Sequence, residues 1–286
     1  MSDKPAAGTR EIRGIRVPAF FYGTAWKEER TTDCVRHALA AGFRAIDSAN
    51  QRRHYVEAGV GAAVKEAIAA GRVTRDALFL QTKFTHRAGQ DHRLPYDPAA
   101  PLAMQVRQSM ASSLEHLGTD RVDSYVLHGP ASGVGWTEGD DEVWGAMIRL
   151  RDEGKTRLLG VSNVSHLHLD QLAARGCELP AFVQNRCYAR MGWDRSVRDF
   201  CAKHDIFYQG FSLLTANPEV MGCPDVRAMA ARLGGTPAQV VFRFAQQVGM
   251  IPLTGTTDPE HMRVDLASQA FELSPEEVAF IESLSA

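Results

Sequence analysis

The chain has 286 residues, of which 44% are hydrophobic and 23% are charged, and its formal net charge is -2. This length and apolar content suffice for a globular core, and a chain of roughly 250 residues can form one domain if its fold is an α/β barrel. Because acidic and basic residues are mixed along the chain, the charge supports neither a nucleic-acid partner nor an anionic membrane, and a small molecule is the more natural partner.

Short β-rich runs alternate with longer amphipathic segments, which is the pattern of βα units and a parallel sheet. In chain order, strands are expected at residues 18–25, 43–47, 78–83, 122–128, 157–162, 181–185, 206–212 and 250–255. Helices are expected between them, for example at residues 31–42, 62–71, 101–118, 140–154 and 235–249. In these segments apolar residues recur three or four positions apart and a glycine closes the segment. The helix at 235–249 begins with Thr236 as N-cap and Pro237 in its first turn.

Eight strands followed by helices predict a closed (β/α)8 TIM barrel, with residues 9–17 as a hairpin that caps its bottom. An open doubly wound sheet is the alternative, but no GxGxxG motif follows the first strand. No linker or second composition zone interrupts the sequence. We therefore expect residues 1–286 to form one barrel domain.

The sequence contains no run of about 18 apolar residues, and its first residues contain no apolar segment long enough for a signal peptide. We therefore expect a cytoplasmic protein. The five cysteines form no paired framework and no CxxC motif, which fits reduced thiols. No metal site is expected, because His166 and His168 are two positions apart and do not share a helical face.

Three consecutive predicted strands end in a reactive side chain: Asp47, Lys83 and His128 close the second, third and fourth strands. In a barrel of this kind the chemistry belongs to the C-terminal ends of the strands, and neighbouring strands lie about 5 Å apart. Each residue alone is more often a helix cap or a solvated rim residue. Three of them on adjacent strands indicate a shared site at the barrel mouth.

Seven short motifs resemble those of the aldo-keto reductase family. They are GTAW after the first strand, GFRAIDSA, LQTK, VLHGP, GVSN, VQN and IPLTG, in the order and rough spacing that the family shows. Each motif is weak alone, but together they cover nearly the whole chain. The resemblance implies an oxidoreductase that reduces aldehydes and ketones to alcohols with NAD(P)H.

The resemblance also implies a tetrad of aspartate, tyrosine, lysine and histidine, and Asp47, Lys83 and His128 match three of its positions. The tyrosine is displaced, because Arg52 stands five residues after the aspartate, where the family usually has it. Tyr55 is the only tyrosine between Asp47 and the next helix, so it is the candidate acid. A longer loop can fold back and point its last residue into the mouth. In the alternative, Tyr55 packs on its helix as a hydrophobic staple.

As general acid, Tyr55 would deliver a proton to the carbonyl oxygen, although a free tyrosine has a pKa of about 10. We expect Lys83, held by Asp47, to lower the pKa of Tyr55. His128, as a neutral donor, would orient the carbonyl oxygen beside the tyrosine. His54 is the second candidate for the acid.

The cofactor site is also carried over from the resemblance. Its residues are Gly23, Thr24, Ser162, Asn163, Gln184, Phe211, Ser212, Leu213, Gly255, Thr256, Thr257, His261 and Asp265. Among them Ser162, Asn163 and Gln184 match the positions that bind the nicotinamide amide. Phe211 matches the aromatic residue that stacks on the nicotinamide ring.

The adenosine end departs from the family pattern. Of the basic pair that usually binds the 2'-phosphate, the lysine is replaced by Leu253 or Gly255, depending on alignment, and the arginine by His261. Backbone amides at the following helix start still form an anion site. Asp265 stands where a neutral amide is common, and its charge weakens phosphate binding, while Arg263 is a nearby substitute cation. NADPH is the expected cofactor from the resemblance, with NADH possible.

For the substrate pocket, Trp26, Trp136 and Tyr188 are candidate apolar walls. Long loops rich in Gly and Pro after the third, fourth and seventh strands are expected to line it. Because the sequence ends about where the last barrel helix would end, we expect an open pocket with a broad preference for aldehydes. The oligomeric state is not predicted, and a monomer is compatible with the sequence.

Two other classes of function fit parts of the pattern. A cofactor-binding regulatory or sensor protein with little turnover is favoured by the displaced tyrosine. A barrel lyase or isomerase would use Lys83 as a Schiff-base amine, but no glycine-rich phosphate loop follows the seventh strand.

Overall fold

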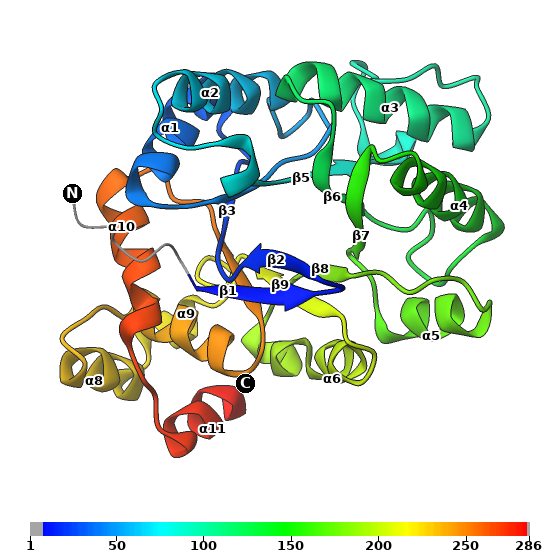
Figure 1. The fold of residues 1–286 in the computed structure, drawn as a ribbon. Helices are drawn as coiled ribbons and strands as arrows, with labels where there is room; N and C mark the ends of the chain where they lie inside the picture. Colours follow the sequence, from blue (N-terminus) through cyan, green and yellow to red (C-terminus); the bar gives the residue numbers. More distant parts are fainter. Residues whose placement is uncertain (1–7, 285–286) are drawn as a thin grey trace.

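The computed structural model describes residues 8–284, and its centre is a closed barrel of parallel strands (Figure 1). The barrel strands are β3 (Phe21–Gly23), β4 (Ala45–Asp47), β5 (Phe79–Phe84), β6 (Val122–Leu127), β7 (Thr156–Ser162), β8 (Phe182–Arg186), β9 (Phe207–Phe211) and β10 (Ile251–Thr254). They follow one another around the barrel in chain order, and β10 pairs with both β9 and β3. The predicted (β/α)8 barrel is confirmed, and the open doubly wound alternative is wrong.

Helices surround the barrel (Figure 1). They are α1 (Thr31–Ala41), α2 (Glu57–Ala69), α3 (Leu102–Leu117), α4 (Glu138–Asp152), α5 (His166–Ala174), α6 (Arg195–Lys203), α7 (Pro218–Gly222), α8 (Pro224–Arg232), α9 (Pro237–Gln247), α10 (Pro259–Ala267) and α11 (Pro275–Ser283). The predicted closing glycines are left-handed caps, with φ of 116° at Gly42 and 64° at Gly118. Thr236 caps α9 in a capping box with Gln239, as its position before Pro237 predicts.

Helix α2 begins at Glu57, earlier than the start at residue 62 that the sequence predicts. Two glycines in its first turns, Gly59 and Gly61, lower the helix propensity, so the sequence pattern does not indicate that the helix begins at Glu57. The packing requires the second of them, because a Cβ at Gly61 would lie 2.1 Å from the carbonyl oxygen of His116 in α3. Close contact between the two helices therefore outweighs local propensity.

The hairpin of β1 (Thr9–Ile12) and β2 (Ile15–Pro18) lies across one end of the barrel in Figure 1. Ile12 and Val17 are buried in the same cluster as Phe21, Phe182 and Phe207 of the barrel interior. The expected hairpin at the barrel bottom is confirmed. Its apolar side chains close the N-terminal end, which leaves the C-terminal end as the open mouth.

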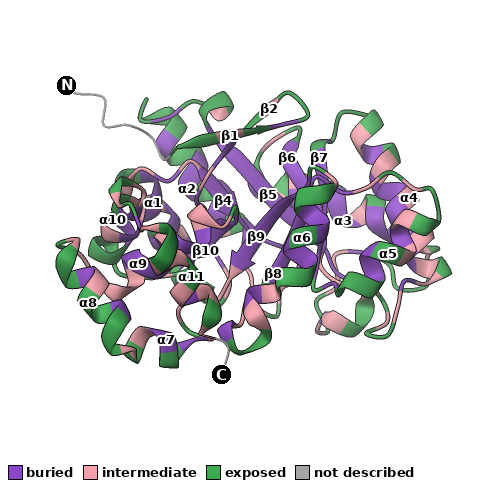
Figure 2. Ribbon diagram, turned by 90° about the horizontal axis from the view of Figure 1, so that it is seen from below, coloured by how far each residue is buried: buried purple, intermediate pink, exposed green. Residues whose placement is uncertain are grey.

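The barrel interior is layered, because alternate residues of a strand point to the same side. The lower layer is apolar and includes Phe21, Ala45, Phe79, Leu158, Phe182, Phe207 and Ile251. Two residues further along their strands, Gln81, Gln184 and Gln209 form a buried polar layer, and Asp47 is in register with Gln81. Figure 2 shows the buried strands at the centre, surrounded by helices that are buried on one side. The interior thus becomes polar toward the mouth.

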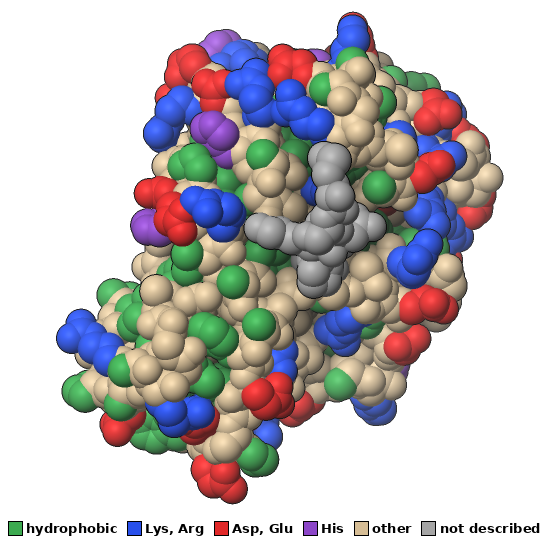
Figure 3. Space-filling view, turned by 60° about the vertical axis from the view of Figure 1, so that its left-hand side comes forward, with side chains coloured by type: hydrophobic (Ala, Val, Ile, Leu, Met, Phe, Trp, Pro, Cys, Tyr) green, Lys and Arg blue, Asp and Glu red, His purple; other side chains and the backbone are tan. Residues whose placement is uncertain are grey.

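The outer surface carries charges of both signs. On the face shown in Figure 3, Lys and Arg side chains are interspersed with Asp and Glu side chains. This distribution agrees with the mixed charge pattern of the sequence. No helix in residues 8–284 is both long and apolar enough to cross a membrane.

Candidate active site

Two cavities adjoin at the C-terminal mouth of the barrel. The first has a volume of about 1030 Å³ and opens between the loops that follow β4, β5, β6 and β8. The second, of about 670 Å³, runs between the ends of β3, β9 and β10 toward α10. Tyr55, His128, Phe211 and Trp26 line both cavities. Their junction is therefore where two ligands can meet.

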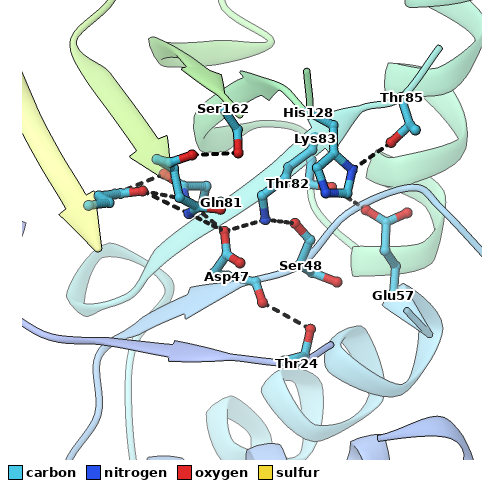
Figure 4. Close-up of polar contacts among 12 residues, drawn as sticks. Thr24, Asp47, Ser48, Glu57, Gln81, Thr82, Lys83, Thr85, His128 and Ser162 are labelled. Carbon is cyan, nitrogen blue, oxygen red and sulfur yellow. Dashed lines mark hydrogen bonds and ion pairs between the residues drawn. The ribbon is translucent and has the colours of Figure 1, made fainter. Parts of the chain in front are cut away.

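Asp47 and Lys83 form a buried ion pair below this junction. Lys83 Nζ donates to Asp47 Oδ1 at 2.6 Å and to the carbonyl oxygen of Ser48 at 2.8 Å, as Figure 4 shows. Both side chains are buried, and Lys83 lines neither cavity. Burial lowers the pKa of Lys83, and the charge of Asp47 opposes this effect.

The loop between β4 and α2 carries Tyr55 to the mouth. Residues 51–55 form one helical turn, in which the backbone N–H of Tyr55 donates to the carbonyl oxygen of Gln51 at 3.0 Å. The turn is held from two sides, because Trp26 N–H donates to the His54 carbonyl and Gln51 Nε2 donates to the Gly89 carbonyl. The extra residues of the loop thus form a turn that folds it back.

The far end of the loop is anchored by Glu57, the first residue of α2. Its buried carboxylate accepts hydrogen bonds from the hydroxyls of Thr82 and Ser113, and the first contact is visible in Figure 4. His116 Nδ1 lies 3.2 Å from the same carboxylate, and this contact raises the pKa of His116. Tyr55, two residues earlier, is consequently held close to β5.

The Tyr55 ring lies beside both Lys83 and His128. Its centroid is 5.8 Å from that of the His128 ring and 5.3 Å from Lys83 Nζ. Burial, together with the charge of Asp47, raises the pKa of Tyr55, which is opposite to the expected direction. The physical reason is that the buried phenolate would be poorly solvated and would be repelled by the Asp47 carboxylate. The phenol therefore keeps its proton at neutral pH, which is the form that donates.

His128 is held by Thr85, a residue that the sequence analysis did not select. Thr85 Oγ1 lies 2.8 Å from His128 Nδ1, as Figure 4 shows. Burial and the positive charge of Lys83 lower the pKa of His128 to about 3, so the ring is neutral at pH 7. A hydroxyl that donates to Nδ1 leaves the ring proton on Nε2. The sequence signal that could have identified Thr85 is its position two residues after Lys83, which places both side chains on the same side of the chain.

The glutamine layer holds Asp47 from below. Asp47 Oδ1 accepts hydrogen bonds from Gln81 Nε2 at 2.7 Å and from Gln184 Nε2 at 3.1 Å, in addition to Lys83. Both glutamine amides also donate to Gln209 Oε1 at 2.9 Å. Gln81 and Gln209 were not predicted from the sequence, although polar residues at inward positions of buried strands were the available signal.

The residues expected to bind a nicotinamide amide lie around the junction. Gln184 Nε2 is used by Asp47 and Gln209, and Asn163 Nδ2 donates to the His128 carbonyl at 2.7 Å. Within the described chain no donor reaches Gln184 Oε1 or Asn163 Oδ1. Two free carbonyl oxygens complement the two N–H bonds of a primary amide. Phe211 lines both cavities nearby, so these residues fit a nicotinamide group.

The structure brings most of the other predicted cofactor residues to the second cavity. Those that line it are Gly23, Ser162, Gln184, Phe211, Ser212, Leu213, Gly255, Thr256, His261 and Asp265. Asn163 lines the first cavity instead. Thr24 is buried behind the site, where its hydroxyl donates to the Asp47 carbonyl at 2.9 Å, and Thr257 lines neither cavity.

Among the described residues, the far end of the second cavity has neither the lysine nor the arginine that the resemblance places there. Leu253, His261 and Asp265 line it there, and burial raises the pKa of Asp265 to about 6. Arg263 lies outside both cavities and pairs with Glu260.

Lys27, which was not predicted, also lines the second cavity. Its ammonium donates to the Gly255 carbonyl. The signal for Lys27 was its place directly after the GTAW motif.

Two of the three predicted pocket aromatics line the first cavity. Trp26 stacks on His54 with ring centroids 3.8 Å apart, and Tyr188 lies on the wall formed by the segment after β8. Trp136 lines neither cavity, contrary to its predicted place in the pocket. It is buried and packs against Trp144. Its Nε1 donates to Asp141 in the N-terminal turn of α4 at 2.8 Å, and this hydrogen bond holds the ring against the helix.

Comparison with known proteins agrees with this geometry. A model of the Aldo/keto reductase family matches residues 19–286. An aldo-keto reductase of Mycolicibacterium vanbaalenii is 34% identical over 248 residues, which are 86% of this chain and 80% of that protein. Prostaglandin F synthase 1 of Bos taurus is 27% identical, with 95% of this chain and 89% of that protein covered. An aldo/keto reductase structure from Brucella melitensis matches 98% of this chain and 100% of its own, with a TM-score of 0.82 and 26% identity. The chain therefore belongs to the aldo/keto reductase family and is an NAD(P)H-dependent oxidoreductase.

Proposed function

We propose that the protein reduces aldehydes and ketones to alcohols with Tyr55 as the general acid. The observation that carries this proposal is the meeting of Tyr55, His128 and Phe211 at the junction of the two cavities. When bound, the nicotinamide cofactor supplies the hydride. The first cavity holds the carbonyl compound, and the second holds the cofactor.

Each side chain at the junction has a separate task. Tyr55, neutral at pH 7, donates its proton to the carbonyl oxygen as the carbon is reduced. His128, neutral with its proton on Nε2, hydrogen-bonds the same oxygen and orients it. Lys83 lines neither cavity and Asp47 lines only the second, and the pair acts through position beside Tyr55, where the ammonium stabilises the charge that develops on the tyrosine oxygen.

For the cofactor, the proposal is NADPH, which rests on the family resemblance. NADH is the second candidate, and a specific observation favours it. Leu253 and His261 stand at the end where a 2'-phosphate needs cations, and the carboxyl of Asp265 lines the same end. Dissociation constants for both reduced cofactors, measured by fluorescence, decide between them.

The geometry of the site favours neither of the two alternative functions. The displaced tyrosine was the feature that favoured a sensor with little turnover, and the turn at residues 51–55 brings that tyrosine to the mouth. A Schiff-base role requires Lys83 to contact substrate. Its ammonium is instead buried against Asp47 and Ser48, away from both cavities.

A steady-state assay tests the proposal. Wild type should consume NADPH or NADH with methyl 4-formylbenzoate, a neutral aromatic aldehyde, and form an equal amount of the alcohol. Tyr55→Phe should lower kcat by about 10²- to 10⁴-fold. His54→Phe is the matched control, because His54 lines the same cavity and should change kcat less than about 10-fold. Loss of activity in the His54 variant alone would move the acid to that residue.

A further inference from the structure

Arg186 lines the first cavity at the end of a barrel strand. It is the last residue of β8 and pairs in register with Phe211 of β9. Because alternate residues share a side of the strand, Arg186 follows Gln184 along the interior face of the barrel toward the mouth. It is the only lysine or arginine among the described residues that line this cavity.

The guanidinium of Arg186 is held by aromatic groups and not by an acid. Its Cζ lies 5.6 Å from the centroid of the Phe211 ring, and Nη1 donates to the Tyr188 hydroxyl at 3.5 Å. In the described part of the chain no carboxylate lies within 4.0 Å of it, whereas Arg93 and Arg198 both have acidic partners. Arg186, an exposed residue, therefore carries a positive charge beside the Phe211 and Tyr188 rings that no acid among the described residues compensates.

Asp194, the one acid among the described residues that line the same cavity, does not neutralise this charge. Asp194 Oδ2 accepts hydrogen bonds from Asn185 Nδ2 and from the Tyr208 hydroxyl, both at 2.8 Å. The cofactor does not use the charge either, since Arg186 lines the first cavity and not the second. The charge is thus available to the molecule that occupies the first cavity.

The remaining walls of the first cavity define the other part of that molecule. Trp26 and His54, whose rings stack, line it together with Met191, which is 70% exposed. These surfaces suit an apolar or aromatic body. A guanidinium recognises a carboxylate through two parallel N–H donors.

We infer that the preferred substrates are aldehydes or ketones that carry a carboxylate on an apolar body, and that Arg186 binds this carboxylate. The inference rests on the proposed function of the same site. The carbonyl carbon accepts the hydride, the carbonyl oxygen accepts the Tyr55 proton, and the reduced cofactor is oxidised. The product is a hydroxy acid whose carboxylate is unchanged.

A matched pair of substrates tests the inference. 4-Carboxybenzaldehyde and its methyl ester share the aldehyde and the ring and differ in the charge. In wild type, kcat/KM should be at least about 10-fold higher for the acid than for the ester, as expected of a charge-assisted hydrogen bond. Arg186→Met, which keeps the apolar contact with Phe211, should remove this preference and leave kcat/KM for the ester within about 3-fold.

Two further variants separate a specific contact from a general charge effect. Arg190 lies over the Tyr188 ring at 5.0 Å but lines only a neighbouring surface pocket. Arg190→Met should therefore keep the preference for the acid, and Arg186→Lys should keep part of it. If the Arg186→Met and Arg190→Met variants lose the preference for the acid equally, the preference comes from the general positive charge of this surface, and the inference is overturned.

A binding measurement completes the test without turnover. Titration calorimetry with the product analogue 4-(hydroxymethyl)benzoate should show binding to wild type that weakens about 10-fold in Arg186→Met. If the ester is reduced well but the acid has no advantage in rate or affinity, the carboxylate site is refuted while the carbonyl reductase function stands. If neither aldehyde is reduced, the proposed function itself fails.

Discussion

Replacing Asp265 by asparagine should stabilise the protein at neutral pH. Asp265 lies in α10, is 4% exposed, and accepts a hydrogen bond from Thr254 Oγ1 at 2.7 Å. It has no Lys or Arg partner in residues 8–284. Burial without a paired cation raises the pKa of its carboxyl to about 6, because the charged form is poorly solvated.

The magnitude follows from the two pKa values. In the unfolded chain an aspartate has a pKa of about 3.9, so folding strengthens proton binding by about 100-fold. Wild type therefore loses stability as the pH rises from about 4 to about 6, and above that range the cost is about 2 to 3 kcal/mol. Asparagine avoids this cost and still accepts from Thr254. The difference between the proteins should fall to about 0.5 kcal/mol at a pH of about 4.

Urea unfolding of both proteins at neutral and acidic pH measures this difference. Asp258→Asn is the control, because Asp258 is exposed and an asparagine caps the start of α10 as well as an aspartate does. The control should change little at either pH. A wild type and an Asp265→Asn variant of equal stability at neutral pH would refute the reasoning.

The same structure makes three other predictions. Thr85→Val should lower kcat/KM about 10-fold, because the His128 ring loses its hydrogen bond, and should leave cofactor affinity unchanged. Thr85→Ser should restore activity. Activity in the valine variant equal to that of wild type would show that this hydrogen bond does not contribute to catalysis. His261→Arg should tighten NADPH binding about 10-fold and leave NADH binding unchanged, and an equal gain for both cofactors would place the phosphate elsewhere. Gln209→Leu should lower the free energy of unfolding by about 1 to 3 kcal/mol, because the buried amides of Gln81 and Gln184 each lose a hydrogen-bond partner, and an unchanged urea midpoint would contradict this.

Much of the scaffold could be read from local patterns. The eight barrel strands lie within or next to the predicted runs, because apolar β-rich segments are bounded by glycines and helix caps. Asp47, Lys83 and His128 gather at the mouth because parallel strands align their C-terminal ends. The spacing of apolar residues and the order of the strands were sufficient to predict these features.

Other features depend on contacts that a sequence does not display. The position of Tyr55 follows from a turn held by backbone atoms of Trp26 and Gly89, which are distant in the chain. The direction of its pKa shift depends on how deeply it is buried. Trp136 could not be distinguished from a pocket residue, because an aromatic in a loop can turn toward the cavity or under a helix.

The most direct test of the account is the rate of hydride transfer in a single turnover. Enzyme with bound reduced cofactor is mixed with methyl 4-formylbenzoate, and cofactor oxidation is followed for wild type and Tyr55→Phe. The account predicts a rate about 10²- to 10⁴-fold slower in the variant, with the dissociation constant of the cofactor unchanged. Equal rates in the two proteins would contradict the assignment of Tyr55 as the proton donor.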